Sequence, residues 1–455
     1  MLSEKEINEI VNRLARAVAE NGGRAYYVGG YVRDLLLGKK SKDIDIEIHG
    51  IKPSVLENIL DSLGERLSIG ESFGIYSLKH TGIDIAMPRK EKVKGSGHRD
   101  FDVFVDPFIG EKTAALRRDF TVNALMQNIL TGEILDYFGG VDDLHKQILR
   151  HVNNETFAED PLRVLRAAQF SARFNFRVAP ETTDICKTIS ISSLSKERVA
   201  EEMFKALLQS GKPSVFFEFL KECEQLDDWF PEVKSLIGIP QNAEFHAEGD
   251  VWNHTMLVLS EAAKLRGKAV FPKCFMVSAL VHDFGKAVTT KEINGKYHAY
   301  QHELEGIPIA ERFIKRLTDE KKLLEYALNM TRLHMRPNIL AISGSSVKKT
   351  NALFDAAVSP NDLILLSFAD DRGRISDHKT DDAFSFLTKR LQVYKDIMNT
   401  PELGGRDLIE AGLKPDRDFA DLLKYAHKLH LAGIDKESAL KQTVARAKEL
   451  EKQTH

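Results

Sequence analysis

The stretch Tyr26–Gly50, YYVGGYVRDLLLGKKSKDIDIEIHG, decides the fold of the first part of the chain. An apolar run that ends at Val28 predicts a strand, and Gly29 and Gly30 then predict a tight turn into a short helix that ends at Gly38. Backbone N–H groups at the start of such a helix favour an anion such as phosphate. A glycine pair by itself is typical of an ordinary turn.

Acidic and apolar residues alternate over Asp43–Ile48, DIDIEI. In a strand this pattern places Asp43 and Asp45 on one face, roughly 7 Å apart, and the isoleucines on the other. An isolated pattern of this kind is more often a solvated strand face, but beside a phosphate-binding turn it suits Mg²⁺ that bridges a triphosphate. Asp84, in the alternating segment 82–86, is the candidate third carboxylate of a two-metal site, or an ordinary strand-face aspartate.

Two later motifs set arginine beside carboxylates. Arg117–Leu125, RRDFTVNAL, combines two guanidiniums, a carboxylate and an amide, which together can neutralise a triphosphate and hydrogen-bond a ribose. In Glu159–Arg166, EDPLRVLR, Asp160 has the position of a helix N-cap, and Arg163 follows on the same side of the predicted helix. Such a pair can read a nucleobase edge, although capping alone also explains Asp160.

Histidines and aspartates gather in one later region. Imidazoles and carboxylates are ligands for a divalent or transition metal, and the adjacent His282–Asp283 pair lets the aspartate bridge two ions. For His246 a structural role is the better interpretation. The full set is His246, His254, His282, Asp283, His302, His334 and Asp370.

The 455 residues predict two to four domains, since a domain spans roughly 100 to 200 residues. Lys+Arg 64 nearly balance Asp+Glu 67, so any nucleic-acid site must be a local patch. Cys186, Cys223 and Cys274 are widely spaced, which predicts buried reduced thiols rather than a disulfide framework. The N-terminus predicts an amphipathic helix, and no apolar stretch approaches ~18 residues, so a cytoplasmic protein without a membrane span is expected.

Periodicity predicts a mixed sheet with flanking helices in the first ~150 residues and helices afterwards. Residues 88–107, rich in basic residues and glycine, predict a mobile loop. Polar breaks fall at 240–249 and 400–405. The predicted strands are 25–28, 44–48, 74–79, 83–87 and 132–137.

Five motifs in this order resemble the class II tRNA nucleotidyltransferases, which are CCA-adding enzymes, and their poly(A) polymerase relatives. The motifs are GGYVRD (29–34), DIDIE (43–47), RRDFTVNAL (117–125), EDPLRVLRAAQFSARF (159–174) and SKERVAEEM (195–203). The resemblance covers about the first 210 residues. It implies an α+β head at 1–150 with a polymerase-beta-like palm, and an all-α neck at 151–240.

Carried over by position, the resemblance implies that Asp43 and Asp45 hold Mg²⁺, and that Asp160 and Arg163 read cytosine and then adenine. The implied partners are tRNA, CTP and ATP, with no DNA, and the oligomeric state stays open. The candidate nucleotide-binding residues, from the motifs and the resemblance together, are Gly29, Gly30, Arg33, Arg117, Arg118, Asp119, Asn123, Asp160, Arg163 and Arg166.

One segment departs from the family pattern. Residues 87–107, MPRKEKVKGSGHRDFDVFVDP, do not resemble the loop that the family links with the switch from CTP to ATP. The resemblance as a whole implies full CCA addition, and this departure keeps addition of CC only or of A only as alternatives, beside a poly(A) polymerase.

The spacing of His254, His282–Asp283 and Asp370 resembles the HD phosphohydrolases, with His302 and His334 as the extra ligands of a two-metal form. The resemblance implies an HD domain at 241–395 with phosphatase and 2′,3′-cyclic phosphodiesterase activity, whose metal stays open. A phosphohydrolase with an RNA-binding head is the alternative of another class. A noncatalytic tRNA-binding protein ranks last, because binding requires neither set of metal ligands.

The last segment, 404–434, resembles the C-terminal piece of bifunctional bacterial members and implies a tRNA-binding tail at 396–455. Asp416 stands where glycine is expected. Basic residues there, such as Lys414, Arg417, Lys424 and Lys428, can contact tRNA phosphates or belong to a solvated helix face.

Overall fold

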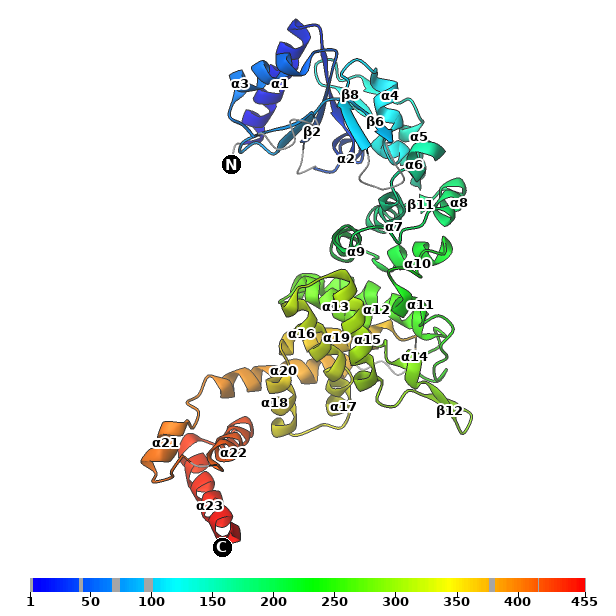
Figure 1. Ribbon diagram of the computed structural model, residues 1–455. Coiled ribbons are helices and arrows are strands. Elements are labelled where there is room, and N and C mark those ends of the chain that lie inside the picture. The colour runs from blue at the N-terminus through cyan, green and yellow to red at the C-terminus, as the bar shows by residue number, and fades with distance from the viewer. Residues whose placement is uncertain are drawn as a thin grey trace. The chain divides into compact units, whose positions relative to one another are not determined.

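The computed structural model describes residues 3–40, 44–67, 74–93, 101–375, 381–415 and 417–454 (Figure 1). The chain divides into two compact units, residues 1–193 and 194–455. Asp43 and Asp416, which the sequence singles out, lie outside the described residues.

The first unit is built on a mixed β-sheet. Within the described residues it has seven strands in the order β3, β4, β5, β2, β1, β8, β9. β2 and β5 are parallel, and the other neighbours are antiparallel. The predicted strands 25–28, 44–48, 74–79 and 83–87 are confirmed within one residue at each end, the predicted strand 132–137 shortens to the two residues of β9, and β3 and β8 were not predicted. The bounds are β1 (Arg24–Val28), β2 (Ile44–His49), β3 (Arg66–Leu67), β4 (Ile75–Leu78), β5 (Ile83–Ala86), β8 (Met126–Asn128) and β9 (Ile134–Leu135).

Helices α1 (Glu4–Glu20) and α3 (Pro53–Leu63) cover one face of this sheet (Figure 1). Leu14 of α1 and Leu60 of α3 belong to the same buried cluster as Ile46 of β2 and Ile83 of β5. The period-two alternation of β2 and β5 sends their apolar residues into this core. Their acidic residues therefore share the opposite face.

The prediction of a loop over 88–107 is wrong for residues 89–93 and 101–105, which form strands. β6 (Arg89–Val93) and β7 (Phe101–Val105) form an antiparallel ribbon, with Arg89 opposite Val105. Aromatic and β-branched residues in 101–105 favour a strand. The glycines that suggested a loop lie in 94–100, outside the described residues.

The rest of the first unit is mainly helical. The Phe120 ring packs edge-on against Phe157 and Phe170, which fixes the segment after α4 to α6 and α7. The elements are α2 (Gly30–Leu36), α4 (Glu111–Leu116), the 3₁₀ turn η2 (Thr121–Asn123), α5 (Gly140–Lys146), β10 (Ile148–Leu149), α6 (Asn154–Ala158), α7 (Leu162–Phe174), β11 (Arg177–Val178) and α8 (Pro180–Thr188).

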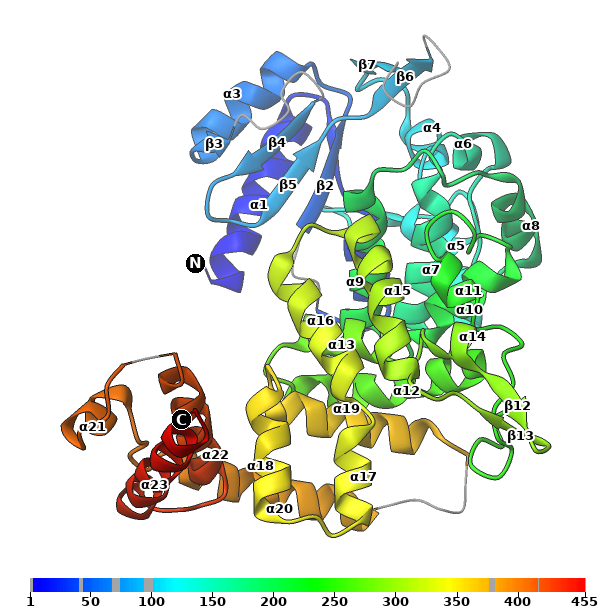
Figure 2. The same ribbon diagram turned by 60° about the horizontal axis from the view of Figure 1, so that its bottom comes forward.

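Among its described residues the second unit is helical apart from one hairpin, β12 (Lys291–Ile293) and β13 (Lys296–His298), visible in Figure 2. The helices predicted after residue ~150 are thus confirmed, apart from this hairpin and the two-residue strand β11. Helix α12 packs closely on α19 at Gly373, where a Cβ would lie only 2.9 Å from the Val258 backbone nitrogen. The helices are α9 (Lys196–Gln209), α10 (Ser214–Glu222), α11 (Pro231–Lys234), α12 (Val251–Leu265), α13 (Pro272–Val281), α14 (Lys286–Thr289), α15 (His302–Leu317), α16 (Lys321–Leu333), α17 (Arg336–Ile342), α18 (Val347–Ala356), α19 (Pro360–Gly373) and α20 (Asp381–Met398), with the 3₁₀ turn η3 (Arg266–Lys268).

The C-terminal helices are α21 (Gly405–Glu410), α22 (Phe419–Leu431) and α23 (Lys436–Thr454). Leu408, Leu422 and Ala439 form their buried cluster. His427 of α22 joins this segment to α18, since its Nε2 lies 2.9 Å from an Asp355 oxygen and its Nδ1 lies 2.5 Å from a Glu402 oxygen.

The cysteines are free thiols, with Cys186 and Cys223 buried and Cys274 half-buried. In the described part of the chain no single helix has the length and apolar character to cross a membrane. One bent pair, α18 with α19 at 102°, meets that test by length and composition.

Candidate active sites

Asp45 and Asp84 lie opposite each other on the parallel strands β2 and β5. Residues in register on neighbouring strands share a face and lie about 5 Å apart. Asp45 is half-buried and Asp84 is exposed, while Ile46 and Ile85 are buried on the other face. The predicted acidic face therefore exists at these two positions, and its oxygens suit a hard divalent cation.

Glu47 extends the acidic face beyond Asp45, as the alternation of DIDIEI predicts, although it was not among the candidate site residues. Its carboxylate accepts a hydrogen bond from Arg118 Nη2 at 2.9 Å and lies 2.8 Å from His49 Nε2. Burial raises the pKa of Glu47, but the Arg118 charge and the His49 hydrogen bond bring it below its ordinary value. An ionised Glu47 thus anchors Arg118 beside the acidic face of β2 and β5.

Arg118 also lies against the glycine turn that opens α2. Gly29 has φ +64°, and a Cβ there would lie 2.9 Å from Arg118 Nη1. The backbone conformation favours glycine at this position, and a Cβ there would displace the Arg118 guanidinium. The predicted anion-binding turn and the predicted arginine are therefore adjacent.

Asp119 is the centre of a buried network. Its Oδ1 accepts from the Phe120 N–H at 2.8 Å and from Asn123 Nδ2 at 3.0 Å, and its Oδ2 accepts from Arg166 Nε at 2.7 Å. Burial raises the pKa of Asp119, but the Arg166 charge and these hydrogen bonds lower it below its usual value. The network joins the RRD motif to α7.

The Arg33 side chain is buried and bonded within the protein, whereas a contact with the nucleotide was expected. Its side chain is 4% exposed, Nε and Nη2 donate to Asp34 Oδ1, and Nη1 donates to Asn123 Oδ1 at 2.6 Å. The guanidinium also lies over the Phe174 ring, 4.3 Å from its centroid. In this structure Arg33 therefore holds Asn123 in position within the protein.

Asp160 and Arg163 lie at the start of α7, as the motif predicts. The N-cap of α7 is Pro161, so the prediction of Asp160 as the N-cap is wrong by one residue, although Asp160 Oδ1 still accepts from the Leu162 N–H at 3.2 Å. Arg163 donates to the carbonyls of Thr156 and Arg117 at 2.6 and 2.5 Å. These contacts fix both side chains, half-buried, on the same turn of the chain.

The second unit brings six of the seven predicted metal-region residues into one buried centre. Asp283 lies between two groups of ligands: its Oδ2 is 3.3 Å from His282 Nε2 and 3.5 Å from His254 Nε2, and its Oδ1 is 3.2 Å from His302 Nε2. The two groups that can each hold an ion are His254, His282 and Asp370, and Asp283, His302 and His334. The bridging role predicted for Asp283 fits this geometry.

The imidazole orientations support cation binding at this centre. The Nδ1 atoms of His282, His302 and His334 face the backbone carbonyls of Ala279, Ala299 and Thr331 at 2.7 to 2.9 Å. A carbonyl only accepts, so each Nδ1 carries the proton and each Nε2 points its lone pair at the centre. His282 Nε2 is buried and lies 3.3 Å from Asp283 Oδ2, which also pairs with Lys286 Nζ at 2.7 Å. Acceptors that face one another require a proton or a metal cation between them.

Charged residues around the centre were only partly foreseen. Burial raises the pKa of Asp283 and Asp370, but Lys286, 2.7 Å from Asp283, and Arg374, 2.8 Å from Asp370, hold both pKa values well below the usual range. Glu248 was missed: its Oε1 lies 3.1 Å from His254 Nδ1. The sequence indicates the Arg374–Asp370 pair by its spacing, because Arg374 follows Asp370 by four residues at the end of α19.

His246 is the seventh residue of the set and stays outside the centre. Its Nδ1 lies 2.7 Å from Glu248 Oε1, and the two residues with His254 form a further group of possible ligands. Glu248 separates it from the ligand nitrogen of His254. The structural interpretation of His246 agrees with this placement.

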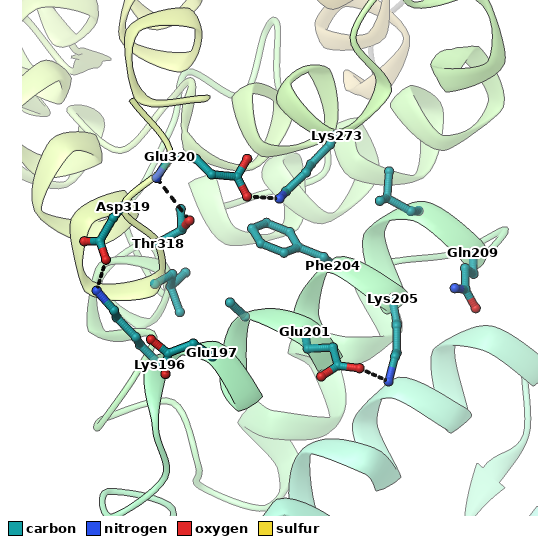
Figure 3. Close-up of a pocket in the computed structure, with 13 residues that line it drawn as sticks. Lys196, Glu197, Glu201, Phe204, Lys205, Gln209, Lys273, Thr318, Asp319 and Glu320 are labelled. Carbon is teal, nitrogen blue, oxygen red and sulfur yellow. Dashed lines mark hydrogen bonds and ion pairs between the residues drawn. The ribbon is translucent and has the colours of Figure 1, made fainter. Parts of the chain in front are cut away.

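A separate groove of about 460 Å³ lies between α9, the start of α13 and the α15–α16 junction (Figure 3). Lys273 lies over the Phe204 ring, 4.1 Å from its centroid, and pairs with Glu320. Lys196 pairs with Asp319, and Lys205 pairs with Glu201. Its lysines are therefore already paired, and it lacks the ligand sets of the two centres.

Three family models match successive parts of the chain: "Poly A polymerase head domain" at 25–150, "Probable RNA and SrmB- binding site of polymerase A" at 175–237, and "HD domain" at 251–374. A multifunctional CCA protein of Pasteurella multocida is 35% identical over 403 residues, which cover 86% of this chain and 92% of that protein. The chain belongs to the multifunctional CCA protein family. A member from Alkalilimnicola ehrlichii is 34% identical over 363 residues, covering 77% of this chain and 84% of that protein.

Solved structures share the fold of this chain over nearly its full length. The Thermotoga maritima CCA-adding enzyme complexed with tRNA has a TM-score of 0.66 at 19% identity, covering 98% of this chain and 96% of that one. The Bacillus stearothermophilus CCA-adding enzyme in complex with CTP has a TM-score of 0.67 at 20% identity, covering 99% and 100%. The α+β head followed by helical domains, inferred from the motifs, is confirmed.

Proposed function

We propose that the head adds C, C and A to the 3′ end of tRNA, with CTP and ATP as substrates. The observation that carries this proposal is the pairing of Asp45 with Asp84 on adjacent strands, next to the glycine turn and Arg118. The family relationship supports it, because the relatives are named multifunctional CCA proteins. The reaction joins the tRNA 3′ hydroxyl to the α-phosphate and releases pyrophosphate.

Each motif has a proposed role. Asp43, Asp45 and Asp84 would hold Mg²⁺, which when bound supplies the charge that stabilises in-line displacement at phosphorus. Gly29, Gly30, Arg117 and Arg118 would bind the triphosphate. Asp160 and Arg163 would form hydrogen bonds with the base edge, and Asp119, Arg166, Asn123 and Arg33 would hold these groups in position through the network described above.

The test is incorporation of labelled CTP and ATP into tRNA that lacks its 3′ end. Asp45→Asn keeps the shape of the side chain but removes its charge, so incorporation should fall by more than about a hundredfold. The matched control is Asp142→Asn, which changes an exposed aspartate paired with Lys146. Undiminished incorporation by Asp45→Asn would refute the metal assignment.

Product length separates the alternatives. Substrates that end before the first C and before the final A should both be completed to CCA. Extension of only one substrate would indicate a CC-adding or A-adding enzyme, and a ladder of adenosines would indicate a poly(A) polymerase.

We further propose that the HD domain is a metal-dependent phosphohydrolase that acts on 2′,3′-cyclic phosphates and phosphate monoesters. The observation that favours it is the bridging of two ligand groups by Asp283. Imidazole and carboxylate ligands suit a divalent or transition metal ion, which when bound polarises the phosphate and activates water. Lys286 would bind a phosphate oxygen.

Asp283→Asn is the decisive variant for this activity. It should lower metal content, measured by elemental analysis, and abolish hydrolysis while nucleotide incorporation continues. Full hydrolysis by Asp283→Asn would exclude this centre.

The proposed partners of the head are tRNA, CTP and ATP. The proposed domains are the head at 1–150, the neck at 151–240, the HD domain at 241–395 and the tRNA-binding tail at 396–455.

A further inference from the structure

The β12–β13 hairpin leads directly into the HD centre. It projects from the helices in both views (Figures 1 and 2) and ends four residues before His302. Its turn residues Asn294 and Gly295 have φ +53° and +74°, which gives the tight two-residue turn of a regular hairpin. The hairpin is therefore a defined element rather than a loose loop.

The hairpin carries an exposed aromatic stack. The rings of His298 and Tyr300 are stacked, with centroids 5.2 Å apart and planes 9° from parallel, and Tyr300 is 68% exposed. Little apolar surface is buried by this pair, so burial in a core does not account for it. An exposed, flat ring held by a second ring is suited to stack on another planar group.

The same face is basic. Lys291 lies opposite His298, and Lys296 lies two residues before it, so the three side chains share one face of the hairpin. Lys296 pairs with Glu244 at 3.0 Å, whereas Lys291 has no ion pair among the described residues. A basic face with stacked aromatic rings is the usual surface for nucleotides and single-stranded RNA.

The stack is tied to a candidate metal ligand. Ala299 lies between the two stacked residues, and its carbonyl accepts the Nδ1 proton of His302 at 2.7 Å. Consecutive Cα atoms are about 3.8 Å apart, so the rings are held close to the group that orients this ligand. The stacked rings and the carbonyl that orients this ligand are therefore adjacent in the chain.

We propose that the stacked His298–Tyr300 pair is a platform for the base of a nucleotide whose phosphate lies at the HD centre. The substrate class is then a base-bearing 2′,3′-cyclic phosphate, as a free nucleotide or at an RNA 3′ end, rather than any small phosphate ester. The proposal rests on the phosphohydrolase function proposed above.

The first experiment compares two substrates with full-length, metal-loaded protein. Adenosine 2′,3′-cyclic phosphate carries a base, and methyl riboside 2′,3′-cyclic phosphate lacks one. Tyr300→Ala should raise KM for the first about tenfold, with kcat nearly unchanged, and should leave the second unaffected. Tyr300→Phe should retain the wild-type KM, and Tyr297→Ala, on the other face of β13, should change neither substrate. An equal effect of Tyr300→Ala on both substrates, or no effect, overturns the platform.

The second experiment does not depend on hydrolysis. Calorimetry of adenosine 2′-phosphate, and of a short RNA that ends in a 2′,3′-cyclic phosphate, should show about tenfold weaker binding to Tyr300→Ala. If neither substrate is hydrolysed but this loss is found, the phosphohydrolase function fails and the platform stands. If Tyr300→Ala weakens binding of the RNA but not of adenosine 2′-phosphate, the platform binds the base at an RNA end. Equal binding by wild type and variant, or no binding by wild type, overturns the platform.

Discussion

Removal of the Asp119 carboxylate should loosen the junction between the RRD motif and α7. Asp119→Ala removes the carboxylate that pairs with the Arg166 guanidinium and accepts from two donors, the Phe120 N–H and the Asn123 amide. Loss of one partner of a buried ion pair costs about 3 to 5 kcal/mol. Because the Arg166 side chain is 33% exposed, water replaces part of the loss, and about 2 to 3 kcal/mol remains.

Hydrogen exchange of the amides in η2 and α7 is the appropriate assay. Both tryptophans, Trp229 and Trp252, lie in the second unit, so their fluorescence does not report on this junction. A loss of about 2 to 3 kcal/mol corresponds to a roughly 30- to 150-fold decrease in protection where exchange proceeds by opening of this junction. Asp142→Asn, which removes an exposed pair, should change protection by less than about fivefold.

The pH dependence has a definite sign. The folded-state pKa of Asp119 is below its ordinary value, so its stabilisation is complete above the unfolded pKa of about 3.9 and is lost as pH falls through the lower folded value. The difference between wild type and Asp119→Ala should therefore persist from pH 7 to about 5 and shrink in stronger acid. Equal protection in Asp119→Ala and Asp142→Asn at pH 7 would refute the role of the network.

Two further perturbations test the turn and the tail. Gly29→Ala should destabilise the head by about 1 to 3 kcal/mol, because φ +64° with ψ −129° is a conformation that residues with a Cβ rarely adopt, and should displace Arg118 and weaken triphosphate binding. Gly22→Ala, at φ +81° with open space around it, also carries a backbone cost, so equal nucleotide binding by the two variants would contradict the proposed contact. Burial lowers the pKa of His427, but its two carboxylate partners raise it above 6.5, so its stabilisation is complete below that pH and is lost as pH rises through the raised value. Protection of α22 against hydrogen exchange should fall between pH 6 and pH 8.5 in wild type and stay level in His427→Gln; parallel curves would exclude the titration of His427.

The parts of the sites that could be predicted follow from local periodicity. A period of two in β2 and β5 places Asp45 and Asp84 on the polar face, whatever else the chain does. The candidate HD ligands were selected by residue type, since imidazoles and carboxylates suit metal ions, together with the resemblance of their spacing to the HD phosphohydrolases. Neither inference needed the tertiary arrangement.

The parts that were missed depend on contacts between distant segments. Glu248 lies in the loop before α12, and its carboxylate contacts His254 Nδ1. This contact depends on the folded arrangement of the loop against the helix, so the sequence does not indicate it. Arg33 lies in a motif that favours phosphate binding, yet packing against Phe174 and the hydrogen bond to Asn123 turn its guanidinium inward. A single sequence contains no local signal that separates an arginine that binds substrate from one that orders its neighbours.

The two centres also differ in how firmly each is expected to hold its metal. The head offers carboxylates on an accessible strand face, and hard oxygen ligands of this kind exchange readily and share the ion with a triphosphate. The HD centre surrounds its ion positions with imidazoles whose tautomers are fixed by Ala279, Ala299 and Thr331. Outer contacts of this type raise metal affinity, because they remove the cost of orienting each ligand. One chain can thus use a metal that arrives with each nucleotide in the head and a retained metal in the HD domain.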